Sequence, residues 1–61
     1  MLVIRKLLDL HIGNDLYTLY ECKGEFVCAY QIFIGKQLVC TFTDLFKCSR
    51  YLLDKWEEVN K

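Results

Sequence analysis

Three glycines interrupt the hydrophobic pattern of this 61-residue chain. The stretches Gly13-Asn14-Asp15, Lys23-Gly24-Glu25 and Gly35-Lys36 have turn composition, because Gly, Asn and Asp tolerate positive φ. They leave four hydrophobic segments and a longer tail. Turn signals at this regular spacing predict an antiparallel β-meander.

The first segment, residues 2–12, fits two descriptions. Its apolar positions and one histidine follow a helical stripe made of Ile4, Leu7, Leu8, His11 and Ile12. A plausible hairpin turn follows the segment, and we therefore expect a strand. A helix over residues 2–12, capped by Gly13, is the alternative and would give an α-β-β-β-α order.

The next three segments predict strands over residues 16–22, 26–34 and 38–42. The first is rich in β-forming residues. The second is apolar at both odd and even positions, as expected of a central strand. Gly35-Lys36 before the third suits a two-residue hairpin loop.

The tail from Asp44 to Val59 predicts an amphipathic helix. One apolar stripe at helical spacing is expected to face the core and consists of Leu45, Cys48, Leu52, Trp56 and Val59. Thr41 or Thr43 is the expected N-cap. The predicted fold is α+β: a single domain over residues 1–61, with a small antiparallel sheet of three or four strands packed on a C-terminal helix.

The register of the sheet decides which side chains remain exposed. Two-residue loops at Lys23-Gly24 and Gly35-Lys36 would place Tyr17 opposite Tyr30 and Ile34 opposite Gln37. The helix is then expected to cover one face, which carries Thr18, Tyr20, Val27, Ala29, Gln31, Phe33, Leu38, Cys40 and Phe42. The opposite face is strongly apolar. Unless the alternative helix over residues 2–12 covers it, we expect it to bind another protein or a second copy through Tyr17, Phe26, Tyr30 and Ile32.

Composition supports an interaction role. Hydrophobic residues make up 54% of the chain, although a domain this short has a thin core. The formal net charge is zero, which argues against non-specific nucleic-acid binding and against electrostatic membrane binding. No signal peptide or transmembrane pattern is visible, and a cytoplasmic location is expected.

The sequence contains no recognisable chemistry. The cysteines Cys22, Cys28, Cys40 and Cys48 form no C-x-x-C pair, and we expect them to be free, with disulfides as one alternative and a zinc site including His11 as another. No nucleophile motif or phosphate-binding loop is present. We expect no catalytic residue, no cofactor and no small-molecule substrate.

The end of the chain resembles small phage and mobile-element accessory proteins that have a β-meander followed by an amphipathic helix. Gly35, Phe42, Thr43, Leu45 and Cys48 stand at the matching places. Such proteins include inhibitors of host or defence enzymes, so the resemblance implies an inhibitor or accessory role in the host cytoplasm. It implies no particular target and no functional residue.

These observations favour a non-enzymatic protein–protein interaction module. A small nucleic-acid-binding domain that uses sheet aromatics is one alternative. A module stabilised by its cysteines or by a metal is another.

Overall fold

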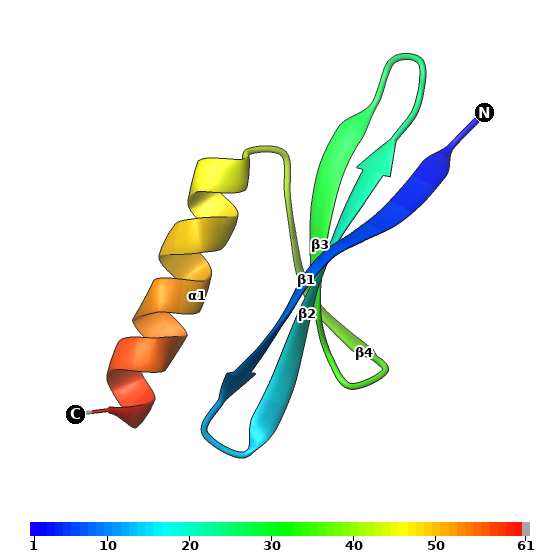
Figure 1. The fold of residues 1–61 in the computed structure, drawn as a ribbon. Coiled ribbons are helices and arrows are strands. Elements are labelled where there is room, and N and C mark those ends of the chain that lie inside the picture. The colour runs from blue at the N-terminus through cyan, green and yellow to red at the C-terminus, as the bar shows by residue number, and fades with distance from the viewer. Residues whose placement is uncertain (61) are drawn as a thin grey trace.

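The computed structural model describes residues 1–60 and shows a four-stranded antiparallel sheet with one C-terminal helix (Figure 1). The elements are β1 (Val3–Ile12), β2 (Asp15–Lys23), β3 (Cys28–Ile34), β4 (Gln37–Phe42) and α1 (Leu45–Val59). The strands are neighbours in chain order, so the sheet is a meander. The predicted α+β fold is confirmed, and β1 is a strand rather than the alternative helix.

Two of the three hairpin turns have two residues, as predicted for Gly35-Lys36. Ile12 faces Asp15 across the first, and Ile34 faces Gln37 across the third. Gly13 and Gly35 open these turns with φ of 63° and 60°. Positive φ is the left-handed region that side chains with a Cβ disfavour, which explains glycine at both positions.

The middle hairpin differs from the prediction. Lys23 pairs with Cys28, so residues 24–27 form a loop, which Gly24 closes by donating its N–H to the Val27 carbonyl at 2.7 Å. Tyr17 therefore faces Ile34 instead of Tyr30. Because the register moves by an even number of residues, each side chain on β2 and β3 keeps its face.

Two β-bulges change the faces of the outer strands. Lys6 faces Tyr20 and Leu8 faces Leu19, so Leu7 is the extra residue in β1. Phe33 faces Leu38 and Ile32 faces Cys40, so Val39 is the extra residue in β4. A bulge adds one unpaired residue and shifts the alternation beyond it. Both Leu7 and Val39 pack against the hydrophobic core.

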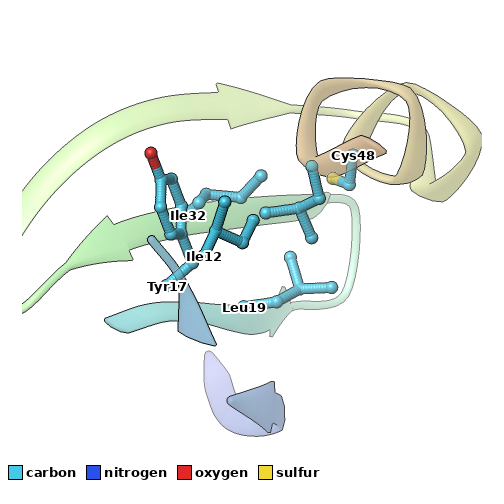
Figure 2. Close-up of a cluster of buried hydrophobic side chains, with 6 residues drawn as sticks. Ile12, Tyr17, Leu19, Ile32 and Cys48 are labelled. Carbon is cyan, nitrogen blue, oxygen red and sulfur yellow. The ribbon is translucent and has the colours of Figure 1, made fainter. Parts of the chain in front are cut away.

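The bulge in β4 overturns the predicted covering of the sheet. Cys40 and Phe42 lie on the same face as Ile32 and Tyr30, not on the face of Gln31 and Phe33. The helix covers this more apolar face, so the prediction that it covers the face of Gln31 and Phe33 was wrong. The hydrophobic core lies between this face and the helix and consists of Ile12, Tyr17, Leu19, Ile32, Cys48 and Leu52 (Figure 2).

Asp44 caps the helix, in place of the predicted Thr41 or Thr43. Its backbone is extended, and its Oδ1 accepts the Phe46 N–H at 2.9 Å. Asp is among the best N-cap residues because it satisfies a free N–H of the first turn. At the other end, both the backbone N–H and the Nδ2 of Asn60 donate to the Trp56 carbonyl.

The sheet extends beyond the helix. In Figure 1 the start of β1 and the β2–β3 hairpin project together, away from α1. The other end of the sheet, with the β1–β2 turn, lies near the C-terminal end of the helix. The fold therefore has a covered half and a projecting half, which offer different surfaces.

Candidate interaction surfaces

The structure separates the four residues expected to bind a partner. Tyr17 is 6% exposed and Ile32 is fully buried, so both belong to the core beneath the helix. Tyr30 is partly buried against that core. Its hydroxyl is hydrogen-bonded with the Cys28 thiol at 3.8 Å, and this bond together with desolvation raises the pKa of Tyr30. Phe26 is 93% exposed.

Phe26 belongs to an apolar tip at the projecting end of the sheet, formed with Met1, Leu2 and Val27. The four side chains are all well exposed. A Cβ placed on Gly24 would lie 3.6 Å from Leu2 Cδ1 and 4.0 Å from Val27 Cβ. The start of the chain and the 24–27 loop therefore meet around Gly24.

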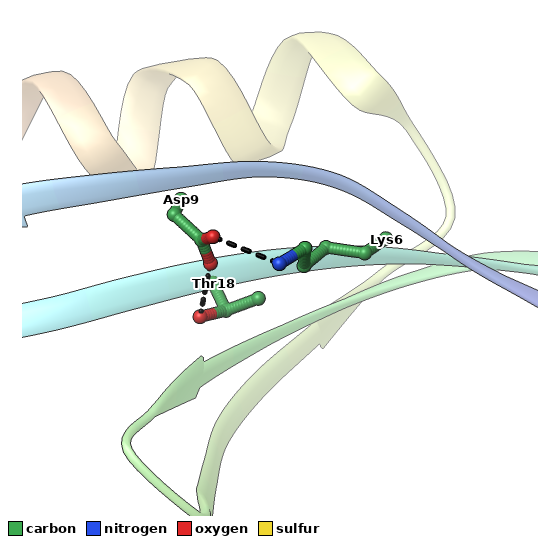
Figure 3. A network of polar contacts seen from close by, with 3 residues as sticks. All are labelled: Lys6, Asp9 and Thr18. Atoms are coloured by element: carbon green, nitrogen blue, oxygen red, sulfur yellow. Dashed lines mark hydrogen bonds and ion pairs between the residues drawn. The ribbon is translucent and has the colours of Figure 1, made fainter.

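The sheet face opposite the helix has no covering element within residues 1–60, and it is half polar. Asp9 accepts hydrogen bonds from the Lys6 ammonium and the Thr18 hydroxyl, both at 2.9 Å (Figure 3). The bonds from Lys6 and Thr18 hold the pKa of Asp9 below its ordinary value. Antiparallel sheets tolerate an exposed face when it is polar, as here.

The same open face also carries an aromatic pair. The rings of Tyr20 and Phe33 meet edge to face, with centroids 5.4 Å apart. They line a shallow hollow of about 340 Å³, whose other walls are Ile4, Gln31, Gly35 and Lys36. The hollow offers stacking surface, one amide and one ammonium group.

A second apolar surface runs along the free edge of β1 and the adjoining side of the helix. Leu8 and Leu10 pair with the core residues Leu19 and Tyr17, yet they are 41% and 38% exposed. On the helix, three half-exposed side chains lie on the flank away from β4: Leu45, Leu53 and Trp56. We call these five residues the β1 edge surface.

The opposite flank of the helix closes against β4. The Phe42 and Tyr51 rings lie 6.0 Å apart, and Lys55 Nζ stands 5.4 Å from the centre of the Tyr51 ring. Burial raises the pKa values of the nearby Cys40 and Cys48 thiols and of the Tyr51 hydroxyl. The ring contact joins the helix to β4 on this flank, and a shallow hollow of about 490 Å³ remains beside it, lined in part by Phe42, Phe46 and Arg50.

The cysteines do not pair with one another. Cys22 and Cys48 are buried, Cys40 is partly buried, and Cys28 is exposed in the projecting hairpin. Among residues 1–60, no three side chains of metal-binding type come together. No helix in this range has the length and apolar content needed to cross a membrane.

Sequence reasoning named Phe26 but missed the rest of both apolar surfaces, although a signal for each was present. Phe26 and Val27 follow Gly24-Glu25, which is compatible with a longer turn as well as with a strand. The adjacent Leu7 and Leu8 break strand alternation, which is the pattern a bulge produces. Comparison with known protein families, curated proteins and solved structures finds no match to this chain.

Proposed function

We propose that this protein is a non-enzymatic protein–protein interaction module, and that its apolar tip binds an apolar surface of another protein. The observation that carries the proposal is Phe26, which projects 93% exposed from a loop beside Leu2 and Val27. Exposed apolar groups on this scale mark interaction sites more often than they serve the monomer.

The loop that presents Phe26 is held in place. Gly24 and Val27 close it with a short backbone hydrogen bond, and the flanking strands pair up to Lys23 and Cys28. An ordered loop backbone loses little conformational freedom on binding, and aromatic anchors are frequent hot spots of interfaces. Burying one such side chain contributes about 1.5–3 kcal/mol.

The finer part of the proposal is an accessory or inhibitor role of the phage type, in the cytoplasm of a host. It is supported by the resemblance of residues 35–56 to small phage and mobile-element accessory proteins. A short chain with one sheet, one helix and a projecting apolar tip suits the occlusion of a partner's surface.

Site-specific photocrosslinking tests the proposal. Benzoylphenylalanine replaces Phe26 in one variant and Lys36 in a control, since Lys36 lies at the opposite turn of the sheet. Both proteins are irradiated in extract of the cells that produce the protein. We expect position 26 to give a discrete adduct with another protein that position 36 does not give. Equal adducts, or none, at position 26 contradict the proposal.

A second variant separates binding from folding. Phe26→Asp removes the anchor from an exposed loop and should leave the unfolding midpoint nearly unchanged. Without irradiation, the Phe26→Asp chain should no longer capture the protein that crosslinking identifies. Glu25→Gln is the matched control, because it changes an exposed side chain of the same loop that is not part of the apolar tip.

The open sheet face favours a second candidate function, the binding of single-stranded nucleic acid. Tyr20 and Phe33 present rings there, and Lys36 borders the same hollow. Bases stack on such aromatics, with strong salt dependence of the affinity. Fluorescence anisotropy with a labelled oligonucleotide at low salt should then show binding that Tyr20→Ala weakens. The net charge of zero makes this the weaker candidate.

A further inference from the structure

The outer edge of β1 is the longest unpaired strand edge of the described chain. β1 spans Val3–Ile12 and pairs only with β2, whereas the other edge strand, β4, is shorter. A free strand edge presents unpaired N–H and C=O groups that another strand can use. This edge adjoins the β1 edge surface, so backbone pairing and apolar burial could occur together.

The charges of β1 complement one another when the strand is paired with itself. Lys6 and Asp9 form an ion pair within each chain at 2.9 Å. In an antiparallel pair that sets Leu7 of one copy opposite Leu8 of the other, Lys6 of each copy also faces Asp9 of the other. Lys6 and Asp9 lie on the same open face of the sheet, since they face Tyr20 and Thr18 of β2. Opposite charges directly across a strand pair stabilise it.

The same arrangement brings the apolar side chains of the two copies together on one side of the joined sheet. A twofold axis perpendicular to the sheet keeps each face on its own side, so both helices lie on one side of the joined sheet. Leu8 and Leu10 then lie at the seam beneath the two helices, and Leu53 and Trp56 of each helix face the other copy. The bulge at Leu7 lies at the axis, so the ladder forms on either side of it.

A dimer of ordinary stability would have to bury more than the five side chains of the β1 edge surface, so the backbone of β1 and its neighbours must take part. A standard interface buries about 800 Å² on each partner, which is about one sixth of the 4722 Å² surface of this chain. The formal net charge of zero adds no repulsion between copies. A different protein that pairs with this edge would need charges complementary to Lys6 and Asp9 and an apolar surface beside its own strand. A second copy of the chain supplies both.

We propose that the chain forms a twofold dimer through antiparallel pairing of β1 with β1, closed by the β1 edge surface of each copy. The dimer leaves the apolar tip with Phe26 outside the seam, so it goes beyond the proposed function and does not depend on it. Two copies would then present two tips on one particle, which raises avidity for a partner with repeated sites.

A charge-exchange experiment tests the pairing. Sedimentation equilibrium of the unaltered chain over a range of concentrations should give a dimer that dissociates on dilution. Asp9→Lys places two lysines against two lysines, and Lys6→Asp places two carboxylates against two carboxylates. Each variant alone should weaken the dimer at least about tenfold, because like charges then lie opposite in two places. A mixture of the two variants should restore a dimer of mixed composition.

Matched controls separate the dimer from folding and from the tip. Glu58→Lys reverses a charge on the helix and should leave the dimer unchanged, as should Phe26→Asp. If Asp9→Lys fails to fold alone, Leu8→Gln provides a second variant, since Leu8 is half exposed, and it should also weaken the dimer. A monomer at every concentration overturns the proposal, and so does a dimer that neither charge variant weakens.

Discussion

Val59, in the last turn of α1, packs on Gly13 in the β1–β2 turn. A Cβ added to Gly13 would lie 3.3 Å from both methyl carbons of Val59, closer than ordinary contact. Gly13 also has a φ of 63°. The turn and the helix end therefore meet at a point where only a residue without a Cβ fits comfortably.

Replacing Gly13 by alanine should destabilise the fold through both effects. The left-handed backbone costs a residue with a Cβ about 1–2 kcal/mol, and the contact with Val59 adds to it. Gly35→Ala is the matched control, because Gly35 has a φ of 60° and no atom within 4 Å of the added Cβ. Urea unfolding should show a larger loss for Gly13→Ala than for Gly35→Ala.

A double-mutant cycle isolates the contact. In a Val59→Ala background, Gly13→Ala should cost less free energy of unfolding than in the unaltered chain, because the two methyl groups are gone. Equal costs in the two backgrounds would show that Val59 does not press on the turn.

Asp44→Ala should destabilise the protein by about 0.5–2 kcal/mol, because it removes the acceptor of the Phe46 N–H. Thr43→Ala changes an exposed neighbour and leaves that bond in place, so its effect should be small. Thermal unfolding followed by circular dichroism measures both. A larger loss for Thr43→Ala would instead support the cap expected from the sequence.

Thiol labelling should distinguish the four cysteines. Cys28 is exposed and should react rapidly with iodoacetamide in the folded protein. Cys48 has no exposed surface, and burial raises the pKa of its thiol, so little thiolate is present at neutral pH. Peptide mass spectrometry should locate the fast adduct at Cys28, and Cys28→Ser should remove the fast phase. Rapid native labelling of Cys48 would contradict the packing of the helix.

Asp9 should make the stability depend on pH in the acid range. Its hydrogen bonds with Lys6 and Thr18 lower its pKa in the folded state, so the unfolded state binds more protons. The stabilisation is complete above the unfolded-state pKa of about 3.9 and is lost as the pH falls through the folded-state value. Urea unfolding of Thr18→Val, which lacks one donor, should show a weaker dependence on pH below about 4. An unchanged dependence would exclude this hydrogen bond as a source.

The elements of the fold could be predicted because their signals are local. The glycines at positions 13 and 35 indicated turns, and the apolar stripe of residues 45–59 indicated a helix that faces the core. The faces of β4 could not be predicted in the same way. Strict alternation puts Val39 on one face and Cys40 on the other, whereas the bulge lets both pack toward the core.

The candidate site was predicted less well than the fold, since it depended on that register. Tyr17 and Ile32 were expected to be exposed because the helix was assigned to the opposite face. Phe26 is exposed for a different reason, as it leaves the sheet within a loop of residues 24–27. Period-two patterns assign faces within a strand, but loop length and helix docking decide which face meets water.

The two bulges have a consequence for insertions and deletions. Removing Leu7 or Val39 would leave a regular strand with every remaining side chain on its present face. Removing a residue elsewhere in β1 or β4 would carry the side chains beyond it to the other face. Leu7 and Val39 are therefore the positions at which an outer strand can lose a residue without moving its other side chains to the opposite face, although the contacts of these two side chains with the core would be lost.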